Sequence, residues 1–145
     1  MYTCTFFGHK DTPSAVAVPL EALIITLILE ENVSAFYVGN HGQFDVIVRR
    51  VLKNVKKQFP HISYAVVLAY LPVNNDNNED YSDSVYPEVL ANVPKRFAIS
   101  KRNEWMITQS DFVISYVTYS TGGAAKFTDS AKKKGKTVFN IAENK

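Results

Sequence analysis

Residues 36–48 read FYVGNHGQFDVIV and contain a strand, a glycine turn and the start of a helix in direct succession. The apolar run 36–38 is typical of a buried strand, and Gly39 and Gly42 allow the chain to turn sharply. From Phe44 onward the apolar residues recur at intervals of three and four, as on one face of an amphipathic helix. This strand–turn–helix order is typical of α/β proteins with a parallel sheet.

The same alternation of strand-like and helix-like segments continues on both sides of this stretch. Strands are predicted at 2–7, 35–38, 62–71, 112–117 and 137–141, and helices at 14–31, 44–59, 98–109 and from 122 to about 134. Segment 74–83 is predicted to be a long surface loop, and whether it closes over a ligand stays open. We therefore predict a single Rossmann-like three-layer α/β domain over residues 1–145, with a mainly parallel sheet of about five strands.

Composition and charge exclude several classes of protein. Hydrophobic residues make up 46% and charged residues 21%, which is ordinary for a globular domain, and the net charge is only +2. The charge is evenly spread, so a nucleic-acid partner is not expected. One cysteine cannot form an internal disulfide, and the three histidines lack the spacing of a metal pair, so neither a metal nor a cofactor is predicted. No signal peptide or membrane span is recognisable, so we expect a cytoplasmic protein without a membrane partner.

Unusual residues follow three of the predicted strands. In parallel α/β sheets the ligand crevice lies beyond the carboxyl ends of the strands. Here these ends carry Gly8-His9, the turn from Gly39 through Asn40 to Gly42, and a hydroxyl-rich run that leads through Thr121 to Gly122 and Gly123. Free N–H groups at the start of the following helices favour an anion such as phosphate. The turn at 39–42 has neither the dinucleotide-binding nor the P-loop spacing, so a tight structural turn remains the alternative there. For the segment that leads to Gly122 and Gly123 the alternative is a flexible glycine turn.

Three polar residues are further candidates for ligand contact. Asp45 could orient a ribose hydroxyl or a nearby backbone amide, or act only on the positive end of its helix. Arg102 and Asn103 lie near the apolar face of helix 98–109, where an unpaired charge is unfavourable. Arg102 could therefore bind a ligand phosphate or form an internal ion pair with Asp111 or Asp45.

Two residues are candidates for catalysis. His9 could hydrogen-bond a phosphate or act as an acid or base near neutral pH, or it could be a loop histidine held by Asp11. Glu88 lies between two prolines and could serve as nucleophile or general base in the cleavage of an N-glycosidic bond. No second carboxylate stands at a fixed spacing from Glu88.

Several motifs, taken in order, resemble one known group of proteins. They are residues 3–10, 36–45, 101–106, 110–111, 122–124 and 134–138. Together they resemble the YpsA-like branch of the SLOG superfamily, whose relatives include the Smf/DprA and LOG proteins, and the resemblance spans residues 3–141. It implies a Rossmannoid domain that binds a nucleotide or nucleotide-derived ligand. By position, the resemblance implies these ligand-facing residues: Gly8, His9, Gly39, Asn40, Gly42, Asp45, Arg102, Asn103, Gly122 and Gly123.

These observations favour a binding protein, a sensor or sequestering protein for a nucleotide-like molecule such as ADP-ribose or an NAD-derived signal. The alternative is a nucleotide N-glycosidase or deoxyribosyltransferase-like hydrolase that uses Glu88 or another acid together with His9. The LOG signature P-G-G-x-G-T-x-x-E has no matching glutamate in residues 120–126, which favours binding over hydrolysis. A third reading, a single-stranded nucleic-acid protein like DprA, is disfavoured by the near-neutral charge. Exposed apolar helix surface could support a homodimer.

Overall fold

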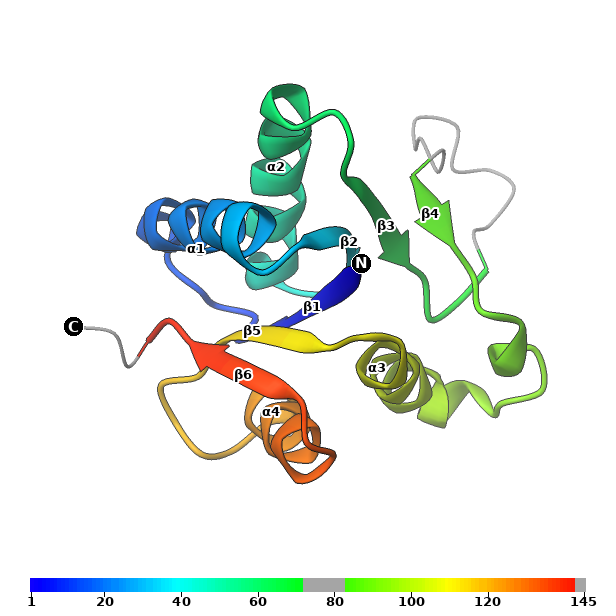
Figure 1. Cartoon of the computed structure of the whole chain (residues 1–145). Helices are drawn as coiled ribbons and strands as arrows, with labels where there is room; N and C mark the ends of the chain where they lie inside the picture. The colour runs from blue at the N-terminus through cyan, green and yellow to red at the C-terminus, as the bar shows by residue number, and fades with distance from the viewer. Residues whose placement is uncertain (72–82, 143–145) are drawn as a thin grey trace.

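Six parallel strands form a single sheet in the order β4-β3-β2-β1-β5-β6 (Figure 1). They are seen in a computed structural model that describes residues 1–71 and 83–142. The strands are β1 (Tyr2–Gly8), β2 (Val33–Val38), β3 (Ser63–Val67), β4 (Ser84–Val85), β5 (Phe112–Tyr116) and β6 (Thr137–Asn140). The central strand β1 is paired with β2 on one side and β5 on the other, and its last residues line the cavity described below.

Helices cover both faces of the sheet, so the predicted three-layer α/β fold is confirmed. Helices α1 (Ala17–Glu30) and α2 (Gln43–Gln58) pack together on one face. Helices α3 (Ala98–Gln109) and α4 (Gly123–Lys133) lie on the other face (Figure 1). Single 3-10 turns precede α1 at Ser14–Val16, precede α3 at Lys95–Phe97, and follow β4 at Glu88–Leu90.

The sheet differs from the prediction in its third and fourth strands. The strand predicted at 62–71 is shorter, because β3 ends at Val67. A sixth strand, β4, pairs with β3 over two residues only, which is too short for a hydrophobic period to reveal. The loop predicted at 74–83 lies outside the described residues except for Asp83.

Two hydrophobic cores lie on the two faces of the sheet. Successive side chains of a strand point to opposite faces, and neighbouring residues divide accordingly. Phe6 and Ile114 belong to the core under α1 and α2, whereas Phe7 and Val113 belong to the core under α3 and α4. Because β1 is covered on both faces, its carboxyl end is held rigidly.

Helix α1 begins at Ala17, so Pro19 lies in its first turn, where a missing backbone N–H is tolerated. Val18 and Leu29 on this helix are exposed. A homodimer through this apolar surface stays a prediction. No helix within the described ranges is long and apolar enough to cross a membrane.

The sheet order places a crevice at one edge. From β1 the chain moves to β2 and β3 on one side, whereas β5 and β6 lie on the other side of β1. The loop after β1 therefore leads to α1 on one face of the sheet, and the loop after β5 leads to α4 on the other face. In open α/β sheets, ligands bind at the carboxyl ends of two such neighbouring strands.

Candidate functional site

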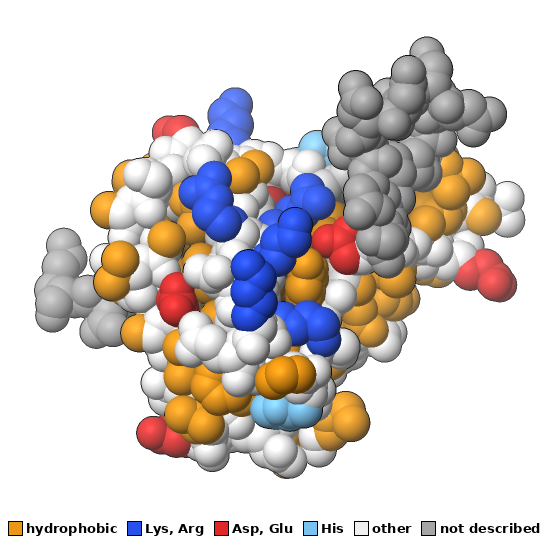
Figure 2. Space-filling model, turned by 90° about the horizontal axis from the view of Figure 1, so that it is seen from above, with side chains coloured by type: hydrophobic (Ala, Val, Ile, Leu, Met, Phe, Trp, Pro, Cys, Tyr) orange, Lys and Arg blue, Asp and Glu red, His pale blue; other side chains and the backbone are white. Residues whose placement is uncertain are grey.

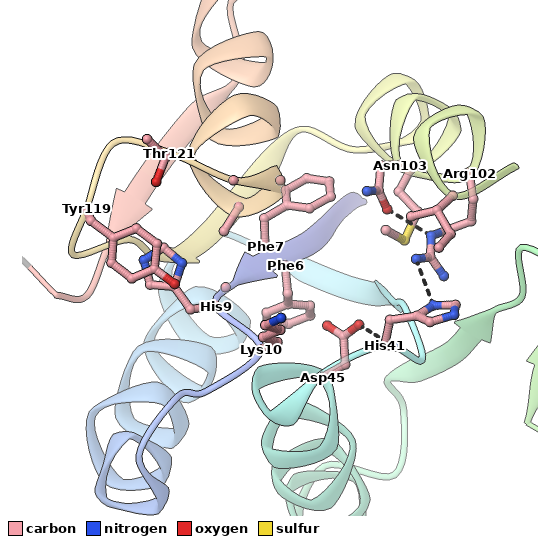
Figure 3. Close-up of a pocket in the computed structure, with 16 residues that line it drawn as sticks. Phe6, Phe7, His9, Lys10, His41, Asp45, Arg102, Asn103, Tyr119 and Thr121 are labelled. Atoms are coloured by element: carbon pink, nitrogen blue, oxygen red, sulfur yellow. Dashed lines mark hydrogen bonds between the residues drawn. The ribbon is translucent and has the colours of Figure 1, made fainter. Parts of the chain in front are cut away.

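A cavity of about 340 Å³ lies at the carboxyl ends of β1 and β5, between the first turns of α2 and α4 and the side of α3 (Figure 3). It is lined by Phe6, Phe7, Gly8, His9, Lys10, His41, Asp45, Ile99, Arg102, Asn103, Met106, Tyr119, Thr121, Gly122, Gly123 and Ala124. The wall is supplied by β1, by the loops after β1, β2 and β5, by the first turns of α2 and α4, and by α3.

The loop after β1 forms one side of the cavity and is tied to the loop after β5. Gly8 lies against the Phe44 ring, which would collide with any side chain at this position. His9 is only 5% exposed, and its Nε2 accepts the backbone N–H of Thr118 at 2.9 Å. The Tyr119 ring stacks on the His9 ring with 3.7 Å between centroids (Figure 3). His9 therefore holds the β5–α4 loop in place.

The surroundings of His9 determine which ring nitrogen carries its proton and the direction in which its pKa is shifted. Because Nε2 accepts a hydrogen bond, a neutral ring carries its proton on Nδ1. Burial lowers the pKa of His9, and the charge of Asp11 opposes this only in part. An acid or base role at Nε2 would first require breaking the bond to Thr118.

The first turn of α4 offers free backbone donors to the cavity. Gly122 precedes the helix with a φ of +91°, and no side chain caps the helix. Within the described part of the chain, the N–H groups of Gly123 and Ala124 donate to no acceptor. A side chain at Gly122 or Gly123 would meet no atom within 4 Å, so the cavity is open here. This end of the helix carries a partial positive charge.

Lys10 adds a full positive charge to the same cavity. It follows His9 directly and forms no ion pair with any carboxylate of the described residues. Its backbone carbonyl accepts the N–H of Gln43 at 2.8 Å, and its Cα packs against Gly42, which has a φ of +90°. A side chain at Gly42 would come within 2.8 Å of that Cα. The start of α2 is thereby fixed against the β1 loop.

Asp45 lies in the first turn of α2 and faces the cavity. It is 9% exposed, and its Oδ2 accepts the backbone N–H of His41 at 3.0 Å. Burial raises the pKa of Asp45 to about 6, although the His41 N–H and the charges of Arg102 and Arg49 act in the opposite direction. A buried carboxylate whose charge is only partly compensated is characteristic of functional sites.

Gly39 lies close to both Asp45 and Arg102. A Cβ atom on Gly39 would lie 2.8 Å from Asp45 Oδ2 and 3.0 Å from the Arg102 guanidinium carbon. No larger residue can therefore stand between the two charged groups without displacing one of them. Gly39 supports the cavity from behind rather than lining it.

Arg102 is 2% exposed and is held by neutral groups. Its Nε donates to Asn103 Oδ1 at 2.8 Å, and its Nη1 donates to the Val67 carbonyl at 2.8 Å and to Asn40 Oδ1 at 3.2 Å. Its Nη2 lies 3.4 Å from His41 Nδ1. Desolvation and the Arg102 charge lower the pKa of His41.

The internal ion pairs considered for Arg102 are not formed. Neither Asp45 nor Asp111 comes within 4 Å of its nitrogens. Asp111 instead accepts the backbone N–H of Thr3 at 3.0 Å. The Arg102 guanidinium is instead stabilised by hydrogen bonds to the carbonyl and amide oxygens of uncharged groups and lies beside the His41 ring.

Most of the predicted site residues meet at this cavity. Those that line it are Gly8, His9, Asp45, Arg102, Asn103, Thr121, Gly122 and Gly123. Gly39, Asn40 and Gly42 lie behind the wall and support it. Glu88 is exposed on the 3-10 turn after β4 and is not among the lining residues. The geometry therefore does not bring Glu88 together with His9, and its catalytic role stays a prediction.

Half of the residues that line the cavity were not predicted from the sequence as site residues. These residues are Phe6, Phe7, Lys10, His41, Ile99, Met106, Tyr119 and Ala124. Position gave a usable signal for some of them. Lys10 directly follows Gly8-His9, and Ile99 and Met106 share the helix side of Arg102 at intervals of three and four.

A separate hollow of about 280 Å³ lies on the outer side of α2 and is lined by Val46, Arg49, Arg50, Lys53, Tyr64 and Asp83. Figure 2 shows Lys and Arg side chains gathered on this face of the molecule. The overall charge conceals this concentration, because the helical period brings Arg49, Arg50 and Lys53 to one side.

Among residues 1–71 and 83–142, no group of three or more His, Cys, Asp and Glu side chains is arranged to hold a metal ion. The chain matches no protein-family model, and a comparison with curated proteins finds no significant match. The resemblance to the YpsA-like branch therefore stays an interpretation of the motifs.

Proposed function

We propose that this protein binds a nucleotide or a nucleotide-derived small molecule in the cavity at the carboxyl ends of β1 and β5. In this proposal it acts as a sensor or sequestering protein, with ADP-ribose or an NAD-derived molecule as specific candidates. One observation carries the proposal. The unsatisfied N–H groups at the start of α4 and the unpaired Lys10 ammonium both border this one cavity.

Phosphate is the anion that these groups suit best. It presents several acceptor oxygens, which can take hydrogen bonds from Gly123, Ala124 and Lys10 at once. The helix end contributes a partial positive charge without needing a counterion. The bare glycines allow the ligand to approach the backbone closely.

The rest of the wall suits the less polar parts of a nucleotide. The nearly buried side chains of Phe6, Phe7 and Met106 form an apolar floor, and Ile99, which is 36% exposed, adds accessible apolar surface. Tyr119 is 47% exposed, so one face of its ring covers His9 while much of the ring remains accessible to a stacking base. The volume is within the range of small-molecule sites, which begins at about 300 Å³.

Thermal unfolding in the presence of nucleotides tests the proposal. The panel includes ADP-ribose, NAD, nucleoside mono- and diphosphates and cyclic dinucleotides. At a hundredfold excess over Kd, a ligand adds about 2.7 kcal/mol to the stability of the folded state. This should raise Tm by roughly 5–10 °C for a domain of this size.

A matched pair of lysine variants locates the binding site. Lys10→Met should weaken binding about tenfold, because a charge-assisted hydrogen bond contributes about 1.5 kcal/mol or more. Lys57→Met, which removes an exposed charge on α2 away from the cavity, should leave the affinity unchanged. Absence of any shift across the panel, or equal effects of the two variants, would contradict the proposal.

A second candidate function is hydrolysis of an N-glycosidic bond, and the observation in its favour is Asp45. This carboxylate borders the cavity and has a pKa raised to about 6, which suits a general acid or base near neutral pH. Chromatographic detection of free base from nucleoside monophosphates tests it. Turnover that disappears in Asp45→Asn and persists in Glu88→Gln supports hydrolysis with Asp45 as the acid, whereas no release of base excludes it for those substrates.

A further inference from the structure

We infer that Asp45 recognises the sugar of the ligand, by accepting hydrogen bonds from the ring hydroxyls of a 5-phosphoribosyl group whose phosphate lies at the start of α4. The inference rests on the proposed function and adds the class of ligand that the cavity selects. Three features of the wall support it.

The first feature is that the Asp45 carboxylate is buried and only partly satisfied. Its single hydrogen bond from the described residues is the His41 N–H on Oδ2. No Lys or Arg nitrogen of the described residues comes within 4 Å. Figure 3 shows the other oxygen turned away from His41, toward Phe6 and Lys10 across the cavity. A carboxylate can accept several hydrogen bonds. This second oxygen is not among the fully buried, unpaired side-chain atoms of the described residues, so it is open to the cavity and can accept a hydrogen bond from a ligand there.

The second feature is the charge around Asp45, which favours a neutral donor. The positive charges of Arg102 and Arg49 already act on the carboxylate through space. Lys10 lines the same cavity. A cationic ligand group would be repelled by all three, whereas a hydroxyl can donate to Asp45 without adding positive charge.

Asn103 strengthens the case for a hydroxyl over other neutral donors. Its Oδ1 accepts the Arg102 Nε–H at 2.8 Å, so its NH₂ group is left to donate elsewhere. In Figure 3 the amide nitrogen of Asn103 is turned toward the cavity. A hydroxyl both donates and accepts, and it can therefore satisfy an acceptor such as Asp45 and a donor such as Asn103.

The third feature is the spacing between the two ends of the cavity. Asp45 lies in the first turn of α2, which follows β2, whereas α4 follows β5, and β1 lies between these two strands. Along the sheet, two strand spacings amount to about 9.5 Å. A 5-phosphoribosyl group with a hydrogen bond of about 3 Å at each end has a reach of this order. Phosphate alone reaches only one end.

Binding of small sugar phosphates tests the inference without assuming a base. The probes are ribose 5-phosphate, its 2-deoxy and 3-deoxy forms, and inorganic phosphate, titrated at pH 8 by NMR. Ribose 5-phosphate should bind at least tenfold more tightly than one or both deoxy sugars, because a missing hydroxyl leaves a buried acceptor unpaired. It should also bind more tightly than inorganic phosphate.

Asp45→Asn and Lys10→Met separate the two ends of the ligand. The asparagine Oδ1 can still accept the His41 N–H but lacks the charge, so Asp45→Asn should reduce the preference for ribose to about twofold or less and leave phosphate binding unchanged. Lys10→Met should weaken all four probes alike. Circular dichroism and urea unfolding verify that both variants are folded.

The results distinguish this inference from the proposed function. If nucleotides stabilise the protein but ribose 5-phosphate binds no better than both deoxy forms, or if Asp45→Asn retains the preference, the sugar inference is wrong and nucleotide binding stands. If neither nucleotides nor phosphate bind, both fail together.

Discussion

Replacing Asp45 with asparagine should increase the free energy of unfolding by more at alkaline pH than at acidic pH. Burial raises the pKa of the carboxyl from 3.8 to about 6 in the folded protein. One unit of pKa corresponds to about 1.4 kcal/mol, so the ionised carboxylate lowers the free energy of unfolding by about 3 kcal/mol. Asparagine has nearly the same shape and never ionises, so it avoids this loss.

The sign follows from which state holds the proton more tightly. Between about pH 4 and pH 6 the folded protein keeps a proton on Asp45 that the unfolded chain has already released. Stability due to this group is therefore greatest below about pH 4 and falls as the pH rises through the folded pKa. Above about pH 7 the loss is complete.

Urea unfolding of the wild type and Asp45→Asn at pH 4 and pH 8 measures the effect. The stability difference between variant and wild type should be about 3 kcal/mol larger at pH 8 than at pH 4. Other titrating groups are common to both proteins and cancel in this comparison. Asp129→Asn, at an exposed site on α4, is the control and should show no comparable change with pH.

A stability difference that does not change between pH 4 and pH 8 would show that Arg102, Arg49 and the His41 N–H compensate fully for the burial of the carboxylate. A difference that shrinks at pH 8 would show that they overcompensate. Either result would remove the physical basis for treating Asp45 as an unsatisfied acceptor. The expected result, in contrast, means that the chain carries a destabilising carboxylate at its cavity, as binding and catalytic sites commonly do.

Three further predictions concern residues around the cavity and the core. Gly39→Ala should lower stability by about 1–3 kcal/mol, because its Cβ would overlap the neighbouring carboxylate and guanidinium. Gly123→Ala, in open space, should raise stability by up to about 1 kcal/mol. Equal effects of the two substitutions in urea unfolding would contradict the packing described. The His9 ring should be neutral with its proton on Nδ1 and titrate below 6.5, as ¹⁵N NMR can measure, and a proton on Nε2 at neutral pH would rule out the bond from Thr118. Cys4 should resist iodoacetamide at pH 8 until urea unfolds the protein, since burial raises the pKa of its thiol; rapid alkylation of the native protein would show that β1 is accessible.

The sequence alone determined the class of fold and the order of the helices and strands, except for the two-residue strand β4. Each of these depends on a local hydrophobic period, which any segment displays without reference to the rest of the chain. Helix α3 begins and ends where predicted, at Ala98 and Gln109. The glycine turns after β1 and β2 and before α4 also point to the edge of the sheet at which the cavity lies, because parallel strands bring their carboxyl ends together.

The tertiary structure alone decided which side chains meet at that edge. Arg102 is bound to acceptors that lie 35 and 62 residues away, at Val67 and Asn40, and no local pattern connects them. Lys10 enters the cavity because it follows the central strand β1. Glu88 lies outside the cavity because it lies on the turn after β4, and this two-residue strand was not predicted from the sequence. Asp45 and Arg102 likewise both lie beside Gly39, where a Cβ atom would come within 2.8 Å of one and 3.0 Å of the other, and this arrangement exists only once the strands have paired.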